Sequence, residues 1–260
     1  MAELKISNYS ASYSSKKNTD TRILKDVSLE VTHEDILGIV GESGSGKTTL
    51  ARGILGQHKI TEGEIYLDDE LLESLPQKTI SKKIQMIFQN PAGSFNPRLK
   101  IKTSLDEIRK IHYSDNEEFG KKLKKLLEKT SIDEELLERF PTQLSGGQLQ
   151  RLSIVRALLV EPEFLIADEA VSALDVSIRG DILKLLEKLH KDLGIGIIFI
   201  SHDLNVVHHI CNKVIVLYHG EIVEAGDTES VYRTPSHEYT KILLDSKTKI
   251  HPDEVKAKVV

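Results

Sequence analysis

Residues 35–48, DILGIVGESGSGKT, decide the fold of this chain. Residues 36–40 form an apolar run, as expected of a β-strand that is covered on both faces of a sheet. Residues 41–48 match the pattern G-x-x-x-x-G-K-[ST], in which a glycine-rich loop opens a helix. Backbone N–H groups of such a loop turn toward a phosphate, and the helix N-terminus adds positive potential. The sequence therefore predicts a strand, a phosphate-binding loop and a helix that begins at Lys47.

The loop is predicted to bind the phosphates of a nucleotide together with a magnesium ion. Lys47 would reach the β- and γ-phosphates, and Thr48 would be a ligand of Mg²⁺. The alternative is an ordinary glycine-rich turn between a strand and a helix, with an exposed lysine. The predicted nucleotide-binding residues of the loop are Gly41, Ser43, Gly44, Ser45, Gly46, Lys47, Thr48 and Thr49.

A second apolar strand, FLIADE at 164–169, ends in two acids. Acids at the carboxyl end of a parallel strand lie where α/β sheets bind ligands, so Asp168 is predicted to hold Mg²⁺ directly or through water. Neighbouring strand residues point to opposite faces, so Glu169 points elsewhere and is the candidate general base for an attacking water. Taken alone, a strand that ends in Asp-Glu is usually the start of a solvated loop.

Outside these motifs the chain alternates between strand and helix patterns. Helices and strands are expected over 148–160, 164–167, 178–193 and 195–201. This alternation implies a parallel sheet with right-handed crossovers. Strand-like segments within 4–31 and 60–72 indicate a separate antiparallel layer.

The middle of the chain, residues 103–140, is highly charged and has a helical pattern. The lysines of its run at 121–125 lie away from the apolar face and are interpreted as a solvated surface. Ser131 and Glu134 have the capping-box spacing for a further helix that ends before Pro141. The predicted fold class is α/β: a P-loop (RecA-like) parallel-sheet core with an antiparallel β layer and a helical insertion subdomain.

The composition excludes several other classes of protein. A formal net charge of −5 argues against a dominant nucleic-acid-binding face. No apolar run approaches the roughly 18 residues of a membrane-spanning helix, and the N-terminus lacks the features of a secretory signal, so we expect a cytoplasmic location. The single cysteine, Cys211, cannot form an internal disulfide or a cysteine-based metal framework.

A third motif, LSGGQ at 144–148, precedes a predicted helix. It resembles the signature of ABC-type ATPases, and the other motifs of that family appear in order along the chain. Gln89 resembles the Q-loop glutamine, His202 the switch histidine, and Tyr13 the aromatic residue that stacks on adenine. The resemblance covers about residues 4–226. The residues that resemble the signature and the D-loop are Leu144, Ser145, Gly146, Gly147, Gln148, Ser172, Ala173, Leu174 and Asp175.

The resemblance implies an ATPase that uses ATP and Mg²⁺ and that closes head to tail with a second ATPase domain. Each ATP would lie between the phosphate loop of one chain and the signature of the other. Ser145 and the neighbouring glycine N–H groups, at a helix N-terminus, would form the second anion site. His202 would contact the γ-phosphate, and Gln89 would sense the metal and the water. The catalytic residues would be Glu169, His202 and Gln89, and the Mg²⁺ ligands Thr48, Gln89 and Asp168.

The resemblance also implies a division of the chain and a subfamily. An ATPase domain is expected over 1–234, with the helical insertion at about 96–155, followed by a short C-terminal extension over 235–260. The segments FNPRLKI and PSHEYTKILL resemble those of the dipeptide, oligopeptide and nickel importer ATPases. This chain departs from that pattern at His237-Glu-Tyr239, where relatives carry a His-Pro-Tyr-type segment. It also has Ala170-Val171 where many related ATPases have Pro-Thr.

Importers of this kind imply a set of partners. These would be a second ABC ATPase subunit in a heterodimer, two membrane permease subunits and an extracytoplasmic solute-binding protein, with no nucleic acid. The chain would lie on the cytoplasmic face of the cell membrane as a peripheral subunit. The surface near Gln89 and residues 96–101 would receive the coupling helices of the permeases.

The cargo and two other functions stay open on the sequence. The chain would energise import of nickel, chelated metals or oligopeptides, and the short C-terminal region favours a metal complex. One alternative is a soluble ABC ATPase that acts in iron–sulfur assembly or nucleic-acid maintenance. Another is a subunit that binds ATP but has a silent catalytic site.

Overall fold

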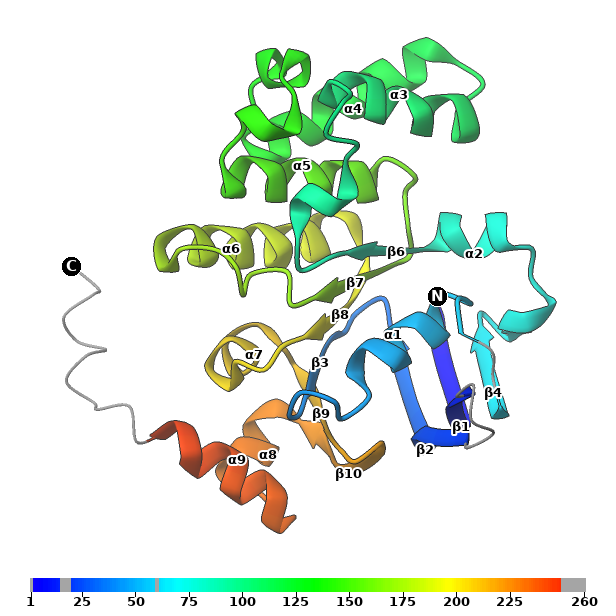
Figure 1. Ribbon diagram of the computed structural model, residues 1–260, viewed down its shortest axis with the longest axis vertical. Coiled ribbons are helices and arrows are strands. Elements are labelled where there is room, and N and C mark those ends of the chain that lie inside the picture. The colour runs from blue at the N-terminus through cyan, green and yellow to red at the C-terminus, as the bar shows by residue number, and fades with distance from the viewer. Residues whose placement is uncertain (1, 15–19, 59–60, 249–260) are drawn as a thin grey trace.

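A computed structural model of the chain describes residues 2–14, 20–58 and 61–248. It confirms the predicted α/β class, with a mostly parallel central sheet, an antiparallel layer and a helical insertion (Figure 1). The predicted C-terminal extension is described as far as residue 248. Within the described residues, no helix combines the length and the apolar character that crossing a membrane requires.

The central sheet has six strands in the order β10-β9-β3-β8-β7-β6. All neighbouring pairs are parallel except β9 and β10, which form an antiparallel pair at one edge. The strands, in chain order, are β3 (Ile36–Val40), β6 (Ile84–Ile87), β7 (Phe164–Asp168), β8 (Gly196–Ile200), β9 (Lys213–Tyr218) and β10 (Glu221–Asp227). Because β3, β7 and β8 are adjacent and parallel, the loops that follow their carboxyl ends gather at one edge of the sheet.

The second sheet is antiparallel, in the order β2-β1-β4-β5. Its strands are β1 (Glu3–Ser14), β2 (Asp20–Thr32), β4 (Glu62–Leu67) and β5 (Glu70–Leu71). Helix α1 (Lys47–Ile54) packs between this sheet and the central one, and most of its residues are buried (Figure 1). The phosphate loop is therefore held by strand β3 at one end and by a buried helix at the other.

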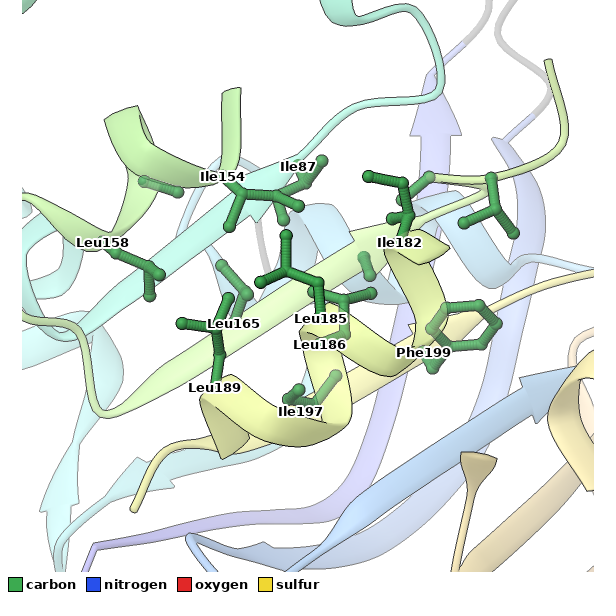
Figure 2. Close-up of a cluster of buried hydrophobic side chains, with 14 of the residues drawn as sticks. Ile87, Ile154, Leu158, Leu165, Ile182, Leu185, Leu186, Leu189, Ile197 and Phe199 are labelled. Atoms are coloured by element: carbon green, nitrogen blue, oxygen red, sulfur yellow. The ribbon is translucent and has the colours of Figure 1, made fainter. Parts of the chain in front are cut away.

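The two faces of the central sheet belong to two separate apolar clusters. In β7, Phe164 and Ile166 face the cluster shared with α1 and the antiparallel sheet, whereas Leu165 and Ala167 face the helices on the other side. Alternation of side chains along a strand makes this division possible, and it explains why the strand sequences are almost wholly apolar. Figure 2 shows the helical side, where leucines and isoleucines of α5 and α6 cover β7 and β8.

The helices cover the central sheet and form the insertion. The α-helices after α1 are α2 (Gln77–Lys83), α3 (Ile101–His112), α4 (Asn116–Thr130), α5 (Gly146–Leu158), α6 (Val176–Leu193), α7 (Leu204–Ile210), α8 (Thr228–Arg233) and α9 (Glu238–Thr248). Short 3₁₀ helices lie at Leu72–Ser74, Pro91–Ser94, Glu134–Glu138 and Pro141–Gln143. Helices α3, α4 and α5 stand together as the green region of Figure 1, at the predicted insertion.

The predicted capping box at Ser131 and Glu134 is wrong. Ser131 has φ of +53° and ends α4 in the left-handed conformation, a common way for a helix to stop. Asp133 is the residue that precedes the next element, and that element is a short 3₁₀ helix whose side-chain cap is missing. The spacing was right for a cap, but the apolar residues Ile132 and Leu137 fold this segment back into the core before a full helix forms.

Asp35, just ahead of β3, ties the central sheet to the turn that follows β2. Its carboxylate is buried and accepts hydrogen bonds from Thr32 N, Asn212 Nδ2 and Lys213 Nζ, at 2.9, 3.1 and 3.0 Å. Burial alone would raise the pKa of Asp35, but these hydrogen bonds outweigh it and hold the pKa below its ordinary value. The ionised carboxylate therefore stabilises the start of the strand that leads into the phosphate loop.

Asp35→Asn is expected to lower the free energy of unfolding at pH 7 by about 2 kcal/mol, because hydrogen bonds to a charged group are lost. A depressed pKa in the folded state means that the stabilisation is present above the unfolded value of 3.8 and is lost as the pH falls through the folded value. The difference between wild type and variant should shrink in acid. Urea unfolding at pH 7 and at several pH values below 3.8 measures this difference in the free energy of unfolding.

Glu34→Gln is the matched control, since the Glu34 side chain is 75% exposed. It should change stability by less than about 0.5 kcal/mol at any pH. A loss for Asp35→Asn that stays constant down to the lowest pH would contradict the assigned role of the ionised carboxylate.

Candidate functional site

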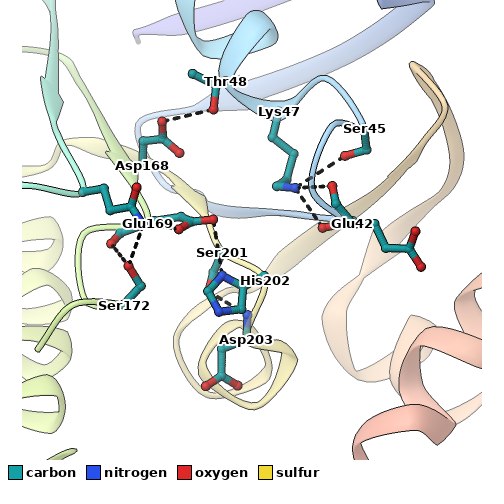
Figure 3. A network of polar contacts seen from close by, with 12 residues as sticks. Glu42, Ser45, Lys47, Thr48, Asp168, Glu169, Ser172, Ser201, His202 and Asp203 are labelled. Carbon is teal, nitrogen blue, oxygen red and sulfur yellow. Dashed lines mark hydrogen bonds and ion pairs between the residues drawn. The ribbon is translucent and has the colours of Figure 1, made fainter. Parts of the chain in front are cut away.

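The phosphate loop, residues 41–48, lies at the carboxyl edge of the central sheet, between β3 and α1 (Figure 3). Gly41 has φ of +152°, and a Cβ there would lie 2.1 Å from the carbonyl oxygen of Leu217 in β9. Gly46 has φ of +111° and precedes the first turn of α1. Both positions require glycine, and together they bend the chain into the cradle that the sequence predicts.

Lys47 is the buried cation of this loop. Its side chain, 7% exposed, donates hydrogen bonds to the carbonyl oxygens of Gly41 at 2.8 Å and Glu42 at 2.7 Å. Burial lowers the pKa of Lys47 below its ordinary value, while the nearby charges of Glu169, Asp168 and Glu42 act in the opposite direction. The ammonium group also lies 3.5 Å from Ser45 Oγ, so neutral oxygens hold it in a buried position from which it can bind phosphate oxygens.

Thr48 and Asp168 face each other across the site. Thr48 Oγ1 lies 3.4 Å from Asp168 Oδ2, although the two residues come from α1 and from the end of β7 (Figure 3). Burial and the charge of Glu169 raise the pKa of Asp168, while Thr48, Lys47 and Arg52 lower it. A hydroxyl and a carboxylate are the kind of oxygen ligands that Mg²⁺ prefers. These residues fit a magnesium ion.

Glu169 is the point where the other predicted catalytic residues converge. Its Oε2 accepts a hydrogen bond from Gln89 Nε2 at 2.7 Å, and its Oε1 lies 3.3 Å from Nδ1 of His202. Its backbone has φ of +48°, in the left-handed region that few residues other than glycine adopt. Such strain is found where the surrounding structure fixes a side chain for function. The structure thus brings together residues that are 80 and 33 positions apart in the chain.

The end of β8 and the D-loop both hydrogen-bond to the backbone of Glu169. The Glu169 N–H donates to the carbonyl oxygen of Ile200 at the end of β8, and Ser172 donates through both N–H and Oγ to the carbonyl oxygen of Glu169. Ser172 Oγ also lies 3.4 Å from Gln89 Nε2. The first D-loop residue therefore fixes the general-base candidate within its own chain.

The remaining D-loop residues connect this cluster to α6. Ala173 and Asp175 are exposed, and Asp175 occupies the N-cap position of α6. Leu174 is buried, and it is the side chain that a Cβ at Gly146 would approach, at 3.6 Å. The D-loop thus joins the predicted catalytic cluster to the signature segment by packing.

The signature residues, at 144–148, form the N-terminus of α5. Ser145 Oγ accepts from Gln148 N at 3.3 Å, and Gln148 Oε1 accepts from Ser145 N at 2.9 Å, which is a capping box. A Cβ at Gly147 would lie 2.8 Å from Ile178 of α6, so this position requires a glycine. Ser145 and Gly146 are exposed. The side chains of Ser145 and Gln148 hydrogen-bond to each other's backbone N–H groups, and these bonds do not involve the phosphate loop.

The other predicted site residues lie on the phosphate loop, at the start of α1 and in β1. Ser43, Gly44 and Thr48 are exposed on the loop, whereas Ser45 and Thr49 are buried. Tyr13 belongs to β1, where it pairs with Thr21, and its side chain lies outside the described part of the structure, so its stacking on adenine stays a prediction.

One residue near the site was missed by the sequence analysis. Tyr239 of α9 accepts a hydrogen bond on its hydroxyl oxygen from the backbone N–H of Glu42, at 3.0 Å. The segment His237-Glu-Tyr239 was noted only as a mark of a subfamily. The pairing joins positions that are 197 residues apart, and no local pattern could have indicated it.

Comparisons with known proteins agree with this geometry. A family model described as ABC transporter matches residues 24–172. The oligopeptide transport ATP-binding protein OppF of Streptococcus mutans is 39% identical over 94% of this chain and 80% of its own length. The protein of the same name from Escherichia coli is 42% identical over 90% of this chain and 72% of its own length. The dipeptide transport ATP-binding protein DppF of Escherichia coli is 40% identical, with coverages of 92% and 72%.

Solved structures show the same architecture. A dimeric ATP-binding cassette in a post-hydrolysis state, bound to ADP and phosphate, is 30% identical with a TM-score of 0.76, over 86% of this chain and 98% of that chain. The protein cbiO1 of Clostridium perfringens, part of the transporter complex cbiONQ, is 26% identical with a TM-score of 0.80, over 98% of this chain and 97% of that chain.

Proposed function

This chain belongs to the ABC transporter family, in the branch of peptide-importer ATPases, and we propose that it drives the uptake of oligopeptides from the cytoplasmic face of a cell membrane. Members of the family bind ATP and couple its hydrolysis to transport, and they work with permeases. For this chain we propose in addition a cargo, a location, a set of partners and a role for each residue of the site.

The observation that carries the proposal is the convergence on Glu169. Its two carboxylate oxygens contact Gln89 and His202, and it stands next to Asp168, which faces Thr48. Lys47 lies close enough for the two acids to influence its pKa. This set combines a phosphate-binding cation, a place for a divalent cation and a general base, which are the parts that phosphoryl transfer to water requires.

Each of these residues has a proposed part in hydrolysis. Lys47 and the loop N–H groups would bind the β- and γ-phosphates, and Glu169 would accept the proton of the attacking water. His202 would contact the γ-phosphate. Thr48, Asp168 and Gln89 would hold Mg²⁺, which neutralises charge on the phosphates when it is bound. Gln89 would release Glu169 as it turns toward the metal.

The exposed signature of this chain would serve the ATP of a second ATPase subunit. Ser145 and the N–H groups of Gly146 and Gly147 stand at the N-terminus of α5, where an anion is stabilised. The solved cassette with ADP and phosphate is itself a dimer. We propose a head-to-tail heterodimer, with Tyr13 against the adenine, that docks on two permease subunits and receives cargo from a solute-binding protein.

The cargo assignment rests on the relatives. The relatives described above are named for oligopeptide or dipeptide transport, at about 40% identity. The sequence alone favoured a metal complex on the length of the C-terminal region. Because these relatives are named for peptide transport, the peptide class is the better supported of the two, and nickel becomes an outcome that the test can reveal.

The test is an uptake assay in cells that lack this chain and in the same cells after it is restored. Uptake of a labelled short peptide should be lost and regained, while uptake of labelled nickel, free or chelated, should not change. The protein should sediment with membranes only when its permeases are present. If only nickel uptake were lost, the cargo would be nickel and not a peptide. A protein that stays soluble in the presence of all its partners would contradict the transporter role.

A further inference from the structure

Tyr239 is a residue of the C-terminal helix that reaches the phosphate loop. Its ring is 7% exposed and belongs to the same apolar cluster as the helical side of the central sheet. Its hydroxyl oxygen accepts a hydrogen bond from the backbone N–H of Glu42 at 3.0 Å. Burial raises the pKa of Tyr239 above its ordinary value, so the group is a neutral phenol at physiological pH.

The peptide unit that Tyr239 holds is the one that also holds Lys47. The N–H of Glu42 and the carbonyl of Gly41 belong to a single planar peptide group, in which they point in opposite directions. The carbonyl oxygen accepts from Lys47 Nζ at 2.8 Å, while the N–H donates to Tyr239. Fixing one end of this rigid unit therefore fixes the other, and with it the direction from which Lys47 is held.

The position of Tyr239 is itself determined by two neighbours. The Glu224 carboxylate of β10 accepts from the backbone N–H groups of Ser236 at 2.7 Å and His237 at 3.1 Å, just ahead of α9. The ring of Tyr218, at the end of β9, stacks on the Tyr239 ring with centroids 4.0 Å apart. The hydroxyl is thus aimed at the loop by contacts that do not involve the loop, and α9 lies beside β10 in Figure 1.

We propose that Tyr239 is a positioning residue of the ATP site, which orients the Gly41–Glu42 peptide and through it Lys47 and the phosphate loop. This inference rests on the proposed role of the loop in binding ATP. It gives the His237-Glu-Tyr239 segment a function, and it makes the nucleotide site dependent on how the C-terminal helix is seated. A change that shifts α9 would then alter ATP affinity without touching a phosphate-binding residue.

The test compares full-length Tyr239→Phe with full-length Tyr218→Phe. Both remove one phenol hydroxyl and keep the stacked pair of rings, but only the first removes the contact with Glu42. Tyr239→Phe should bind ATP about three- to tenfold more weakly, the effect of one lost neutral hydrogen bond. Tyr218→Phe should bind like the wild type. Titration calorimetry with ATP measures the affinity, and thermal unfolding confirms that both variants fold.

The kinetic signature separates positioning from a packing role. With positioning, the KM for ATP rises in parallel with the loss of affinity while kcat stays within about twofold; a packing defect lowers kcat through a smaller active fraction at an unchanged KM. An ATP affinity of Tyr239→Phe equal to that of the wild type, or a loss shared by Tyr218→Phe, would overturn the inference. Lys47→Ala is included because, if it also binds ATP normally, the failure lies in the proposed ATP site itself.

Discussion

Replacing Glu169 with Gln is expected to lower the rate of ATP hydrolysis by about 10²- to 10⁴-fold, the usual contribution of a general base. Binding of ATP should stay within about twofold of the wild type, because no phosphate-binding group changes and the amide has nearly the shape of the carboxylate. The chain should therefore retain ATP in a closed but unproductive complex. Phosphate release by the full chain with its partners measures the rate, and titration with ATP measures the affinity.

The reason for so large an effect is the position of the carboxylate and not its charge alone. Asp168 also carries a carboxyl group but faces Thr48, whereas Glu169 faces Gln89 and His202. The strained backbone at φ of +48°, held by the carbonyl of Ile200, keeps the side chain at the carboxyl edge of β7. An amide there accepts no proton from water, although it can still accept a hydrogen bond from Gln89.

Glu161→Gln is the matched control for this prediction. This substitution removes the same charge as Glu169→Gln, but Glu161 precedes β7 whereas Glu169 follows it. The Glu161 side chain is 61% exposed. Its ATPase rate should equal that of the wild type within about twofold, as expected of a surface change. If Glu169→Gln retained more than a tenth of the wild-type rate, the general base would have to be another group. A subunit with a silent site would show no change in transport.

Local sequence was enough to predict the elements that carry the site. The phosphate loop and the strand 164–167 were predicted almost to the residue, because backbone geometry there is set by adjacent glycines and by runs of apolar residues. The helix after the signature was predicted to begin at Gln148 and begins at Gly146, since Ser145 is its cap. Glycines at a helix start carry little helix propensity, so only the cap geometry reveals the true boundary.

What local sequence could not provide is the set of contacts between distant segments. The pairing of Gln89 with Glu169 depends on β6 lying next to β7, and the strand order of a sheet is a property of the whole fold. The contact of Tyr239 with Glu42 depends on β9, β10 and α9 returning to the first loop of the chain. Ser131 shows the converse, because a correct local motif was overruled by burial of its neighbours.

Lys47→Ala is expected to weaken ATP binding by about 10- to 100-fold, because hydrogen bonds to charged groups contribute about 1.5–3 kcal/mol each. Hydrolysis at subsaturating ATP should fall at least as much. Lys25→Ala is the matched control, since the Lys25 side chain forms an ion pair with the exposed Glu221 and lies outside the loop. It should bind ATP like the wild type. Titration calorimetry on both full-length variants tests the difference.

Loss of Lys47 should also change how stability depends on pH, which gives a readout that needs no nucleotide. Burial and Glu169 raise the pKa of Asp168, and Lys47 is one of the groups that restrain that rise. Without Lys47 the pKa of Asp168 rises further in the folded state. A raised folded pKa means that stability is fully present below the unfolded value of 3.8 and is lost as the pH rises through the folded value. The variant, with the higher folded pKa, should therefore go on losing stability at pH values where the wild type has already levelled off. A stability difference between Lys47→Ala and wild type that is independent of pH would show that the ammonium group does not act on Asp168. Lys47 and Asp168 would then have to bind phosphate and metal independently of each other.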